Sequence, residues 1–590
     1  MLYKILKSEY QDFLDYLKDT SIKSFTENSI LTLDNNEYIF EDISQFNELK
    51  NPKKKDNSQL NDTTMYNKCQ LNDTTDITTS IDKDLIYGKD PTERIVNISI
   101  DDNLVYIYRE LEDGTIDTQV KQANYWIIGA SKPAGKYITL EGSQPYKYLK
   151  EYSDYEDYKV ARINCYKKKS DVYSISNLVE SYMVRNGYTY FKGMKISEVS
   201  VLSFDIETTG LDPKLDDARV LLISNTYRNN KGVITRKLFS LDDYENDAEM
   251  IEDWCSWVRK MNASILLGHN IFSFDLPYLN HRGGGLELGR DDSYLTFEER
   301  PSNLRVDGSQ QYTYFKVHIQ GRELLDTWFL SIKYDIQRKY PNYKLKDIIE
   351  FEGLTQKDRQ FYDASKIKDN WHLPEERVKI KAYCISDSDD SLKLFDLMGP
   401  SFFYFTIHCP KPFQLMLESA SGSQINSMMV RSYLQINKSL PKTTELSPVQ
   451  GAISFGLPKF RCNVLKLDFS GLYPSIIRTW QLYDPIKDPN RNFLKLTDYF
   501  AEERLKHKKI AKDTDDKYYK DLEQMEKQTA NSMYGMLNCQ GLLFNNSLIA
   551  GEITRNAREL LNKITLFFTS IDINKWKEKL DTESEEVENE

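Results

Sequence analysis

The sequence predicts a multidomain α/β protein, and three observations support this fold class. Its 590 residues exceed what one hydrophobic core holds, so we expect about three to five domains. Strand-like alternation begins near Arg94, and strand and helix patterns then alternate from Glu198 to about Phe395. Two long charged helical patterns follow at about 497–512 and 517–537, and they predict a helical part beside the α/β part.

Composition excludes several classes of protein. Hydrophobic residues make up 40% of the chain and charged residues 28%, which is typical of a globular protein and not of a fibre or a disordered polymer. We expect no membrane span, because no apolar run approaches about 18 residues, and no secretory leader. Seven scattered cysteines predict neither a disulfide framework nor a zinc knuckle, so a reducing cytoplasm is expected. The net charge of −12 argues against coating nucleic acid by bulk attraction, but it permits a local basic groove.

Five acidic or phenolic side chains form the first candidate site. Asp205 and Glu207 are two apart in the strand-like segment EVSVLSFDIETTG, so their side chains point to the same face. Asp275 follows the apolar segment ILLGH, and Tyr383 and Asp387 are four apart on a predicted helix. A buried carboxylate needs a partner, and a pair of Mg²⁺ or Mn²⁺ ions about 3.5–4 Å apart would provide one.

The order D-x-E, N-x3-F-D, Y-x3-D resembles the proofreading 3′–5′ exonucleases of the DnaQ-like type. The resemblance implies that the four carboxylates bind two cations and that Tyr383 orients the attacking water. It also implies DNA contacts at Asn270 and Phe274. We expect other nearby acids to be solvated or to act only through these residues, namely Asp326, Asp389 and Asp390.

A second candidate site begins at Asp468, at the end of the strand-like segment NVLKLDF. A turn at Gly471 and a helix from about Pro474 follow, so backbone N–H groups of residues 470–473 would face the phosphates of a nucleotide. The residues concerned are Ser470, Gly471, Leu472 and Tyr473. The ring of Tyr473 would lie under the incoming sugar and leave no room for a 2′-hydroxyl.

Further along, Lys527, Asn531 and Tyr534 recur at helical spacing and share one face. A cation, an amide and an aromatic ring on one stripe suit the triphosphate and base of a nucleotide. Arg504 and Lys508 share a face of the preceding helix and are further candidate phosphate donors.

Together, D-x3-L-Y-P-S-I and K-x3-N-S-x-Y-G resemble polymerase motifs A and B of the family B DNA polymerases. The resemblance implies metal binding at Asp468 and Phe469, two Mg²⁺ or Mn²⁺ ions in each active site, and a template contact at Gly451. It implies a DnaQ/RNase H-like exonuclease domain, an N-terminal β-rich domain, a partial palm and helical fingers. The expected segments are an extension 1–90 with a low-complexity insert 51–84, an N-terminal domain 91–197, the exonuclease domain 198–398, the first palm part 399–483, the fingers 484–536 and a palm-return helix with an acidic tail 537–590.

A second palm carboxylate is expected in this family, on a motif C hairpin downstream of motif B. The only D-T-D, at residues 513–515, precedes motif B in a polar stretch that predicts the turn between the finger helices. We therefore expect the large subunit of a split, phage-like or archaeal polymerase, whose second polypeptide supplies motif C and the thumb. Its expected partners are primer–template DNA and dNTPs, and a sliding clamp is a further candidate.

Two alternatives remain open at this stage. The chain is either a stand-alone 3′–5′ exonuclease that keeps a degenerate polymerase region for binding DNA, or a non-catalytic DNA-binding replication subunit. The first would lack a partner carrying motif C. The second would bind primer–template equally well with and without divalent cations.

Overall fold

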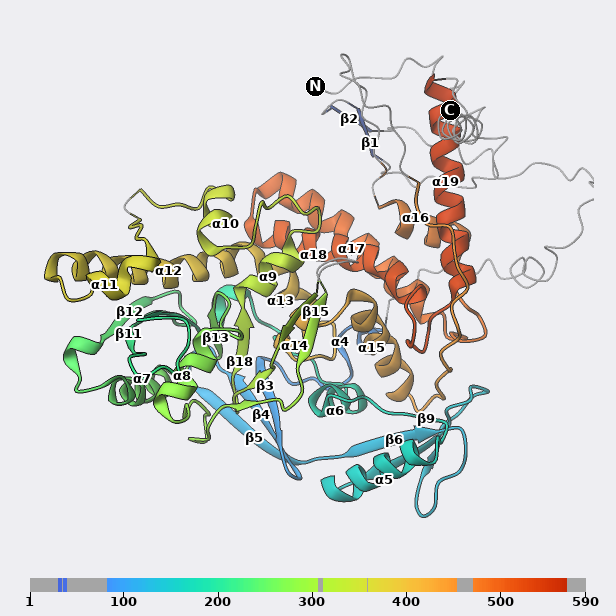
Figure 1. The fold of residues 1–590 in the computed structure, drawn as a ribbon. Coiled ribbons are helices and arrows are strands. Elements are labelled where there is room, and N and C mark those ends of the chain that lie inside the picture. Colours follow the sequence, from blue (N-terminus) through green and yellow to red (C-terminus); the bar gives the residue numbers. More distant parts are fainter. Residues whose placement is uncertain are drawn as a thin grey trace, which may run out of the picture.

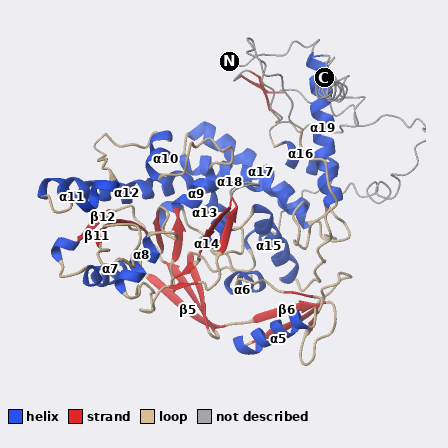
Figure 2. Ribbon diagram, in the orientation of Figure 1, coloured by secondary structure: helices blue, strands red, loops and turns tan. Residues whose placement is uncertain are grey.

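The computed structural model describes residues 82–305, 311–357, 359–453, 469 and 471–569, together with the short paired strands β1 (Ile30–Leu33) and β2 (Asn36–Ile39) (Figure 1). Within these residues no helix combines the length and the apolar composition that a membrane span needs. Several predicted features lie outside the described residues: Asp468, Ser470, almost all of the insert 51–84 and the acidic tail. The rest is a mixed α/β protein, so the predicted fold class is confirmed (Figure 2).

The N-terminal part is rich in strands, as predicted. An antiparallel sheet has the strand order β3 (Ile95–Asp101), β4 (Leu104–Glu110), β5 (Ile116–Gln122). A second sheet has the order β7 (Ile138–Thr139), β8 (Tyr148–Tyr152), β6 (Tyr125–Gly129), β9 (Val172–Tyr173). Three helices accompany these strands, α4 (Lys83–Tyr87), α5 (Tyr155–Lys167) and α6 (Leu178–Asn186). Helix α5 lies against β6 and β8, at the lower right of Figure 1.

A mixed five-stranded sheet forms the centre of the α/β part. Its strand order is β12 (Ile234–Ser240), β11 (Val220–Arg228), β10 (Val201–Thr208), β13 (Ile265–Gly268), β18 (Glu323–Asp326). The strands β10, β13 and β18 are parallel, and β11 is antiparallel to both of its neighbours. Strand β10 is buried along most of its length because α12 packs on it and the hydrophobic core of the domain covers its other face.

Seven helices surround this sheet or extend from it. They are α7 (Asp247–Met261), α8 (Asp275–Gly283), α9 (Thr327–Tyr334), α10 (Leu345–Phe351), α11 (Ile367–Asn370), α12 (Pro374–Met398) and α13 (Pro400–Thr406). Helix α12 packs on β10 and β11, and α7 contacts β11 and β12. Two short ribbons project from the same part, β14 (Thr296–Phe297) with β17 (Val317–His318) and β15 (Ser302–Arg305) with β16 (Gln311–Tyr314).

The described residues after Pro412 are predominantly helical. It contains α14 (Phe413–Glu418), α15 (Ser421–Leu434), α16 (Leu472–Trp480), α17 (Asn492–Thr514), α18 (Lys517–Leu537) and α19 (Ser547–Thr569). Helices α17 and α18 pack closely against each other, along the top of Figure 1. The turn between them holds Asp515 in the left-handed conformation, and Asp516 caps α18. The D-T-D at 513–515 therefore lies at a helix end and its turn, as predicted.

Helix α17 begins five residues earlier than the sequence pattern predicts. The carboxylate of Asp488 accepts hydrogen bonds from the backbone N–H groups of Asn492 (3.0 Å) and Phe493 (2.8 Å), which otherwise have no partner in the first turn. The predicted start near residue 497 depended on the charged pattern of the helix. Its first turn is buried and mostly apolar, so that pattern does not extend to it.

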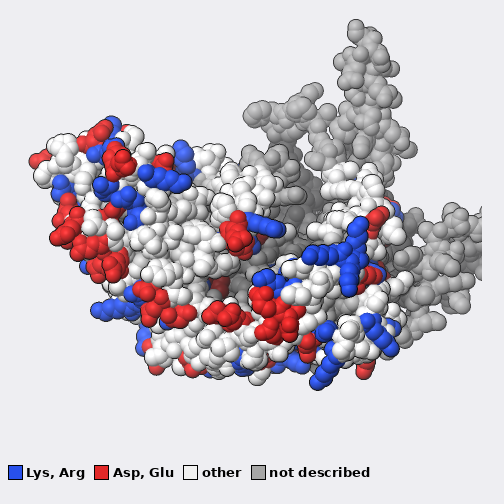
Figure 3. Space-filling view, turned by 60° about the horizontal axis from the view of Figure 1, so that its bottom comes forward, with Lys and Arg blue, Asp and Glu red and all other residues white. Residues whose placement is uncertain are grey.

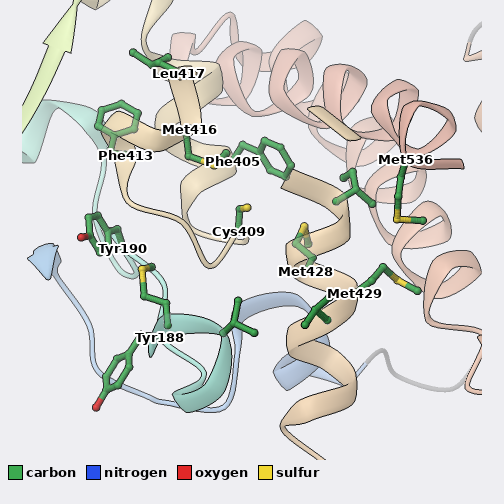
Figure 4. Close-up of a cluster of buried hydrophobic side chains, with 14 of the residues drawn as sticks. Tyr188, Tyr190, Phe405, Cys409, Phe413, Met416, Leu417, Met428, Met429 and Met536 are labelled. Carbon is green, nitrogen blue, oxygen red and sulfur yellow. The ribbon is translucent and has the colours of Figure 1, made fainter. Parts of the chain in front are cut away.

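A buried cluster joins α15 to the neighbouring helices. Met428 and Met429 on α15 lie beside Met536 on α18, and Phe405 projects into the same region (Figure 4). Gly422 permits this packing, since a Cβ there would come within 2.9 Å of the Gly535 carbonyl oxygen. The two helices therefore approach each other almost backbone to backbone.

A single buried carboxylate links three parts of the chain. Glu323 on β18 accepts hydrogen bonds from the Asn97 side chain (2.7 Å) on β3 and from the Gln414 backbone N–H (2.8 Å) on α14. Burial raises the pKa of Glu323 to about 7.

On the face of the molecule drawn in Figure 3, acidic and basic side chains are interspersed around a stretch of uncharged surface.

Candidate active site

Strand β10 presents Asp205 and Glu207 on the same side. The alternation of the strand sends their intervening neighbours, Phe204 and Ile206, into a hydrophobic core on the other side. Glu207 is buried and Asp205 is partly exposed. Carboxylate oxygens of both residues and the Cys384 sulfur all lie within 4.8 Å of one another.

Asp275 is the first residue of helix α8. The sequence predicted that it directly follows a strand, but a turn separates it from that strand. Strand β13 ends at Gly268, and six residues intervene. A Cβ on Gly268 would lie 2.6 Å from the Phe204 carbonyl oxygen, so glycine lets this strand end approach β10 closely. The turn then adopts a positive φ at Asn270, which directs the chain back so that α8 starts beside the end of β10.

Helix α12 supplies Asp387 and Tyr383 from one face, as their spacing predicts. Both side chains are buried, and the Tyr383 hydroxyl donates a hydrogen bond to Asp387. The ammonium of Lys346 on α10 donates to the same hydroxyl and lies 4.2 Å from the centre of the Tyr383 ring. The buried guanidinium of Arg359 donates to Asp387 through Nη2.

The four carboxylates form one electrostatic cluster. Burial, then repulsion by Asp387, Asp275 and Glu207, raises the pKa of Asp205 well above its usual range. Burial, then repulsion by Asp387, raises the pKa of Glu207 to about 8, and Lys346 opposes this shift. Burial also raises the pKa of Asp275 to about 8 and raises that of Asp387. Lys346 and Arg359 oppose the rise in the pKa of Asp387.

Asp326 and Asp390 are buried and contact groups that hold the site, so the second of the two roles expected for them applies. Asp326 accepts hydrogen bonds from backbone N–H groups of Asn270 (2.8 Å) and Phe272 (3.2 Å), and so fixes the turn that leads to Asp275. Asp390 accepts from Arg359 Nε (2.6 Å), which also holds Asp387.

Asp389 points elsewhere. It accepts hydrogen bonds from the Thr226 hydroxyl (2.6 Å) and from Arg236 Nε (2.9 Å). Both partners lie on strands of the sheet rather than in the carboxylate cluster, so Asp389 is a suitable control position on the same helix as Asp387.

The predicted DNA-contacting residues lie at two separate places. Asn270 and Phe274 flank the turn before α8, next to the carboxylate cluster, and the Phe274 ring lies 5.6 Å from that of Tyr278. Gly451 is exposed, and its carbonyl accepts a hydrogen bond from Arg558 on α19 at 2.7 Å. Their roles in binding DNA stay predictions.

The predicted nucleotide site is described in part. Asp468 and Ser470 lie outside the described residues, and Phe469 is partly buried. Gly471 has a φ of 65° and caps α16, which begins at Leu472. The rings of Tyr473 on α16 and Tyr534 on α18 lie 4.9 Å apart, so the segments that carry motifs A and B meet here.

The cationic side chains predicted for phosphate binding lie on α17 and α18. Arg504 donates to Glu523 at 2.9 Å, and its guanidinium would lie 3.4 Å from a Cβ on Gly471. Lys508 is partly exposed on the same helix. Lys527 and Asn531 are exposed on α18, about two turns and one turn before Tyr534 respectively. Arg504 and Tyr534 thus lie beside Gly471 and Tyr473 respectively, and contacts of the other three with this site stay predictions.

Sequence reasoning missed three residues of the first site. Lys346 lies in the segment YKLKDIIEF, where neither its spacing nor its neighbours indicate that a lysine belongs to the site. Arg359 lies in an irregular segment without any periodic pattern, and Cys384 looks like an ordinary core residue of α12. Burial of the Cys384 sulfur raises its pKa well above the usual range, so it remains a thiol.

The donor set fits divalent cations. Hard carboxylate oxygens of Asp205 and Glu207 lie within 4.8 Å, and Asp275 and Asp387 are close enough to raise the pKa of Asp205, so bound cations would offset the cost of ionising these buried acids. Asp205, Glu207, Asp275 and Asp387 are therefore the residues that would hold such cations.

Comparison with known proteins agrees with this geometry. Residues 154–348 match the exonuclease domain of DNA polymerase family B. The DNA polymerase delta catalytic subunit of Plasmodium falciparum is 27% identical over 344 residues, which is 51% of this chain and 29% of that protein. A DNA polymerase of Thermococcus sp. is 26% identical over 422 residues, which is 63% of this chain and 51% of the relative. The chain thus spans about three tenths to one half of the length of these relatives.

A solved structure shares the fold. The family B DNA polymerase of Pyrobaculum calidifontis superposes with a TM-score of 0.64 and 17% sequence identity, covering 80% of this chain and 72% of that one. Residues 154–348 therefore match the exonuclease domain of DNA polymerase family B, and the chain shares its fold with a family B DNA polymerase.

Proposed function

We propose that this chain is a 3′–5′ exonuclease that removes nucleotides from the end of a DNA strand, and that it proofreads in a DNA polymerase. The observation that carries the proposal is the cluster of Asp205, Glu207, Asp275 and Asp387, whose pKa values are all raised. A cluster that repels its own charges gains most by binding cations. The match of residues 154–348 to a family B exonuclease domain supports the same activity.

The side chains of the site have distinct roles in this proposal. Bound Mg²⁺ or Mn²⁺ would supply activation of a water and neutralisation of the leaving oxygen. Tyr383 holds its proton, since burial raises its pKa, and its hydroxyl can orient the attacking water. Lys346 holds the Tyr383 hydroxyl in place, and Arg359 holds the Asp387 carboxylate. Asn270 and Phe274, in the turn before α8, would contact the 3′ end.

Degradation of 5′-labelled single-stranded DNA tests the exonuclease. We expect Mg²⁺-dependent shortening from the 3′ end that chelator stops and that Asp205→Ala reduces by at least about a hundredfold, as for loss of several kcal/mol of transition-state stabilisation. Asp389→Asn is the matched control and should retain activity. Equal activity of wild type and Asp205→Ala would refute the proposal.

We further propose that the chain is the large subunit of a DNA polymerase that adds dNTPs by two-metal chemistry. Proximity of Tyr473 to Tyr534 and of Arg504 to Gly471 supports a nucleotide site between α16, α17 and α18. Asp468 and Phe469 would bind cations there, Ser470 and Leu472 would face the phosphates, and Lys508, Lys527 and Asn531 would complete the site.

Residues 536–590 contain no D-T-D, the pattern expected to carry a second palm carboxylate in the family that the sequence resembles. We propose that a second polypeptide supplies motif C and the thumb. Primer extension by the purified chain, alone and with proteins that bind it in a pull-down, tests this. Extension only in the presence of a partner supports the proposal, and extension by the chain alone at full rate refutes it.

The free cysteines among the described residues favour action in the cytoplasm.

A further inference from the structure

Three side chains of the paired helices α17 and α18 form a second group with metal-binding geometry. Glu503 and His507 are four apart on α17 and therefore face the same way. Glu526 faces them from α18. One donor atom from each of the three lies within 4.8 Å of the other two. The His507 Nδ1 and a Glu526 carboxylate oxygen are 2.7 Å apart. 

The second carboxylate oxygen of Glu526 lacks a hydrogen-bond donor among the described residues. Glu526 is 3% exposed, and its Oε2 is buried without a hydrogen-bond partner among the described residues. Leaving a buried acceptor without a hydrogen bond destabilises the folded state, and more so when the group is charged. Glu503 and Glu523 repel Glu526, while His507 attracts it, and burial is the main cause of its raised pKa.

No nearby cation pairs with the Oε2 of Glu526 among the described residues. Lys506 pairs with Glu503, a member of the group, at 2.5 Å, and Arg504 pairs with Glu523 at 2.9 Å. The Tyr519 ring lies 5.7 Å from the His507 ring and closes one side of the group. Two carboxylates and one imidazole thus converge with one oxygen unused.

We propose that Glu503, His507 and Glu526 bind a zinc ion that joins helices α17 and α18. One imidazole nitrogen and two carboxylate oxygens are ligands that zinc accepts, with water in the fourth position. The nitrogen donor favours zinc over Mg²⁺, which prefers oxygen ligands throughout. The ion would replace the His507–Glu526 hydrogen bond and occupy the free oxygen. This site lies apart from the carboxylate cluster on β10 and does not depend on the proposed function.

Zinc titration of the full-length, tag-free protein tests the proposal. Because Asp205, Glu207 and Cys384 could also take up zinc, the titration uses the Asp205→Ala/Glu207→Ala background after removal of metal by chelator. We expect one equivalent of zinc to bind, with millimolar Mg²⁺ present, in competition with a chromophoric chelator. His507→Gln should weaken this binding at least tenfold, whereas Glu502→Gln, next to the group but paired with Arg478, should not change it.

Two further measurements separate ligation from folding. Circular dichroism should show the same helix content in His507→Gln and its parent. Zinc should raise the melting temperature of the parent but not of His507→Gln. Equal zinc affinity in the parent, His507→Gln and Glu526→Gln, or binding that Mg²⁺ displaces, would overturn the proposal.

Discussion

Replacing Asp275 by asparagine is expected to stabilise the folded chain in the absence of divalent cations, although the residue is buried. Burial and the neighbouring Asp326 raise the pKa of Asp275 from 3.8 to about 8. Between these two pH values the folded carboxyl keeps a proton that the unfolded chain releases. The free energy of unfolding therefore falls as the pH rises from about 4 to about 8, and above that the folded chain carries a buried charge.

The size of the effect follows from this shift. A displacement of roughly four pH units, at about 1.36 kcal/mol each, sets an upper limit of about 5–6 kcal/mol for the cost of the charge at pH 9. The neighbouring carboxyls share one another's protons, and asparagine makes weaker hydrogen bonds to the backbone, so we expect a net gain of about 2 kcal/mol.

A matched variant should respond in the opposite direction. Asp390 is equally buried, but Arg359 (2.6 Å) and Lys393 (2.7 Å) compensate its charge. Asp390→Asn removes the acid that pairs with Lys393 and with Arg359 Nε, although Arg359 keeps Asp387, and we expect a loss of about 3 kcal/mol. Urea unfolding of both variants at pH 9 in chelator measures the two changes.

Magnesium supplies the second half of the test. At 100 times its dissociation constant a ligand stabilises the folded state by about 2.7 kcal/mol. Mg²⁺ should therefore stabilise the wild type and Asp390→Asn, but Asp275→Asn much less. Two results would contradict the predicted cost of the buried Asp275 charge. Asp275→Asn would destabilise the chelated protein as much as Asp390→Asn does, or Mg²⁺ would stabilise all three proteins equally.

Four further changes have defined outcomes. Arg359→Ala should lower the free energy of unfolding by about 3–5 kcal/mol, because two buried carboxylates lose their guanidinium, and chemical denaturation measures this loss. Tyr383→Phe keeps the ring but removes the hydroxyl, and we expect roughly a tenfold to hundredfold lower rate of DNA degradation with unchanged folding. Burial lowers the pKa of His408 to about 3, so stability should fall as the pH decreases from about 6.5, and His408→Phe should flatten this decline in urea unfolding at pH 7 and 5. Gly422→Val would force a Cβ against the Gly535 carbonyl, and we expect a lower melting temperature from the displacement of α15.

Each of these outcomes has a contrary result. A loss below about 1 kcal/mol for Arg359→Ala would mean that Asp387 and Asp390 are solvated. Full activity of Tyr383→Phe would exclude a role for its hydroxyl. An unchanged pH response in His408→Phe, or an unchanged melting temperature in Gly422→Val, would contradict the burial on which those predictions depend.

Sequence periodicity carried the local part of the site. Two-residue spacing placed Asp205 and Glu207 on one side of a strand, and four-residue spacing placed Tyr383 and Asp387 on one side of a helix. The paired helices α17 and α18, with their turn at Asp515, also followed from pattern. These features depend on backbone geometry within a few residues, and sequence spacing records that geometry directly.

The tertiary structure decided which distant groups meet. Arg359 holds Asp387 and Asp390 from an irregular segment, and Lys346 reaches Tyr383 from another helix. No periodic pattern marks such contacts, because they arise from the packing of α10 and the 359 segment on α12 rather than from the twist of any one element. Chain order and spacing thus determined the chemistry of the cluster, while its charge balance depended on long-range packing that brings in cations from elsewhere in the chain.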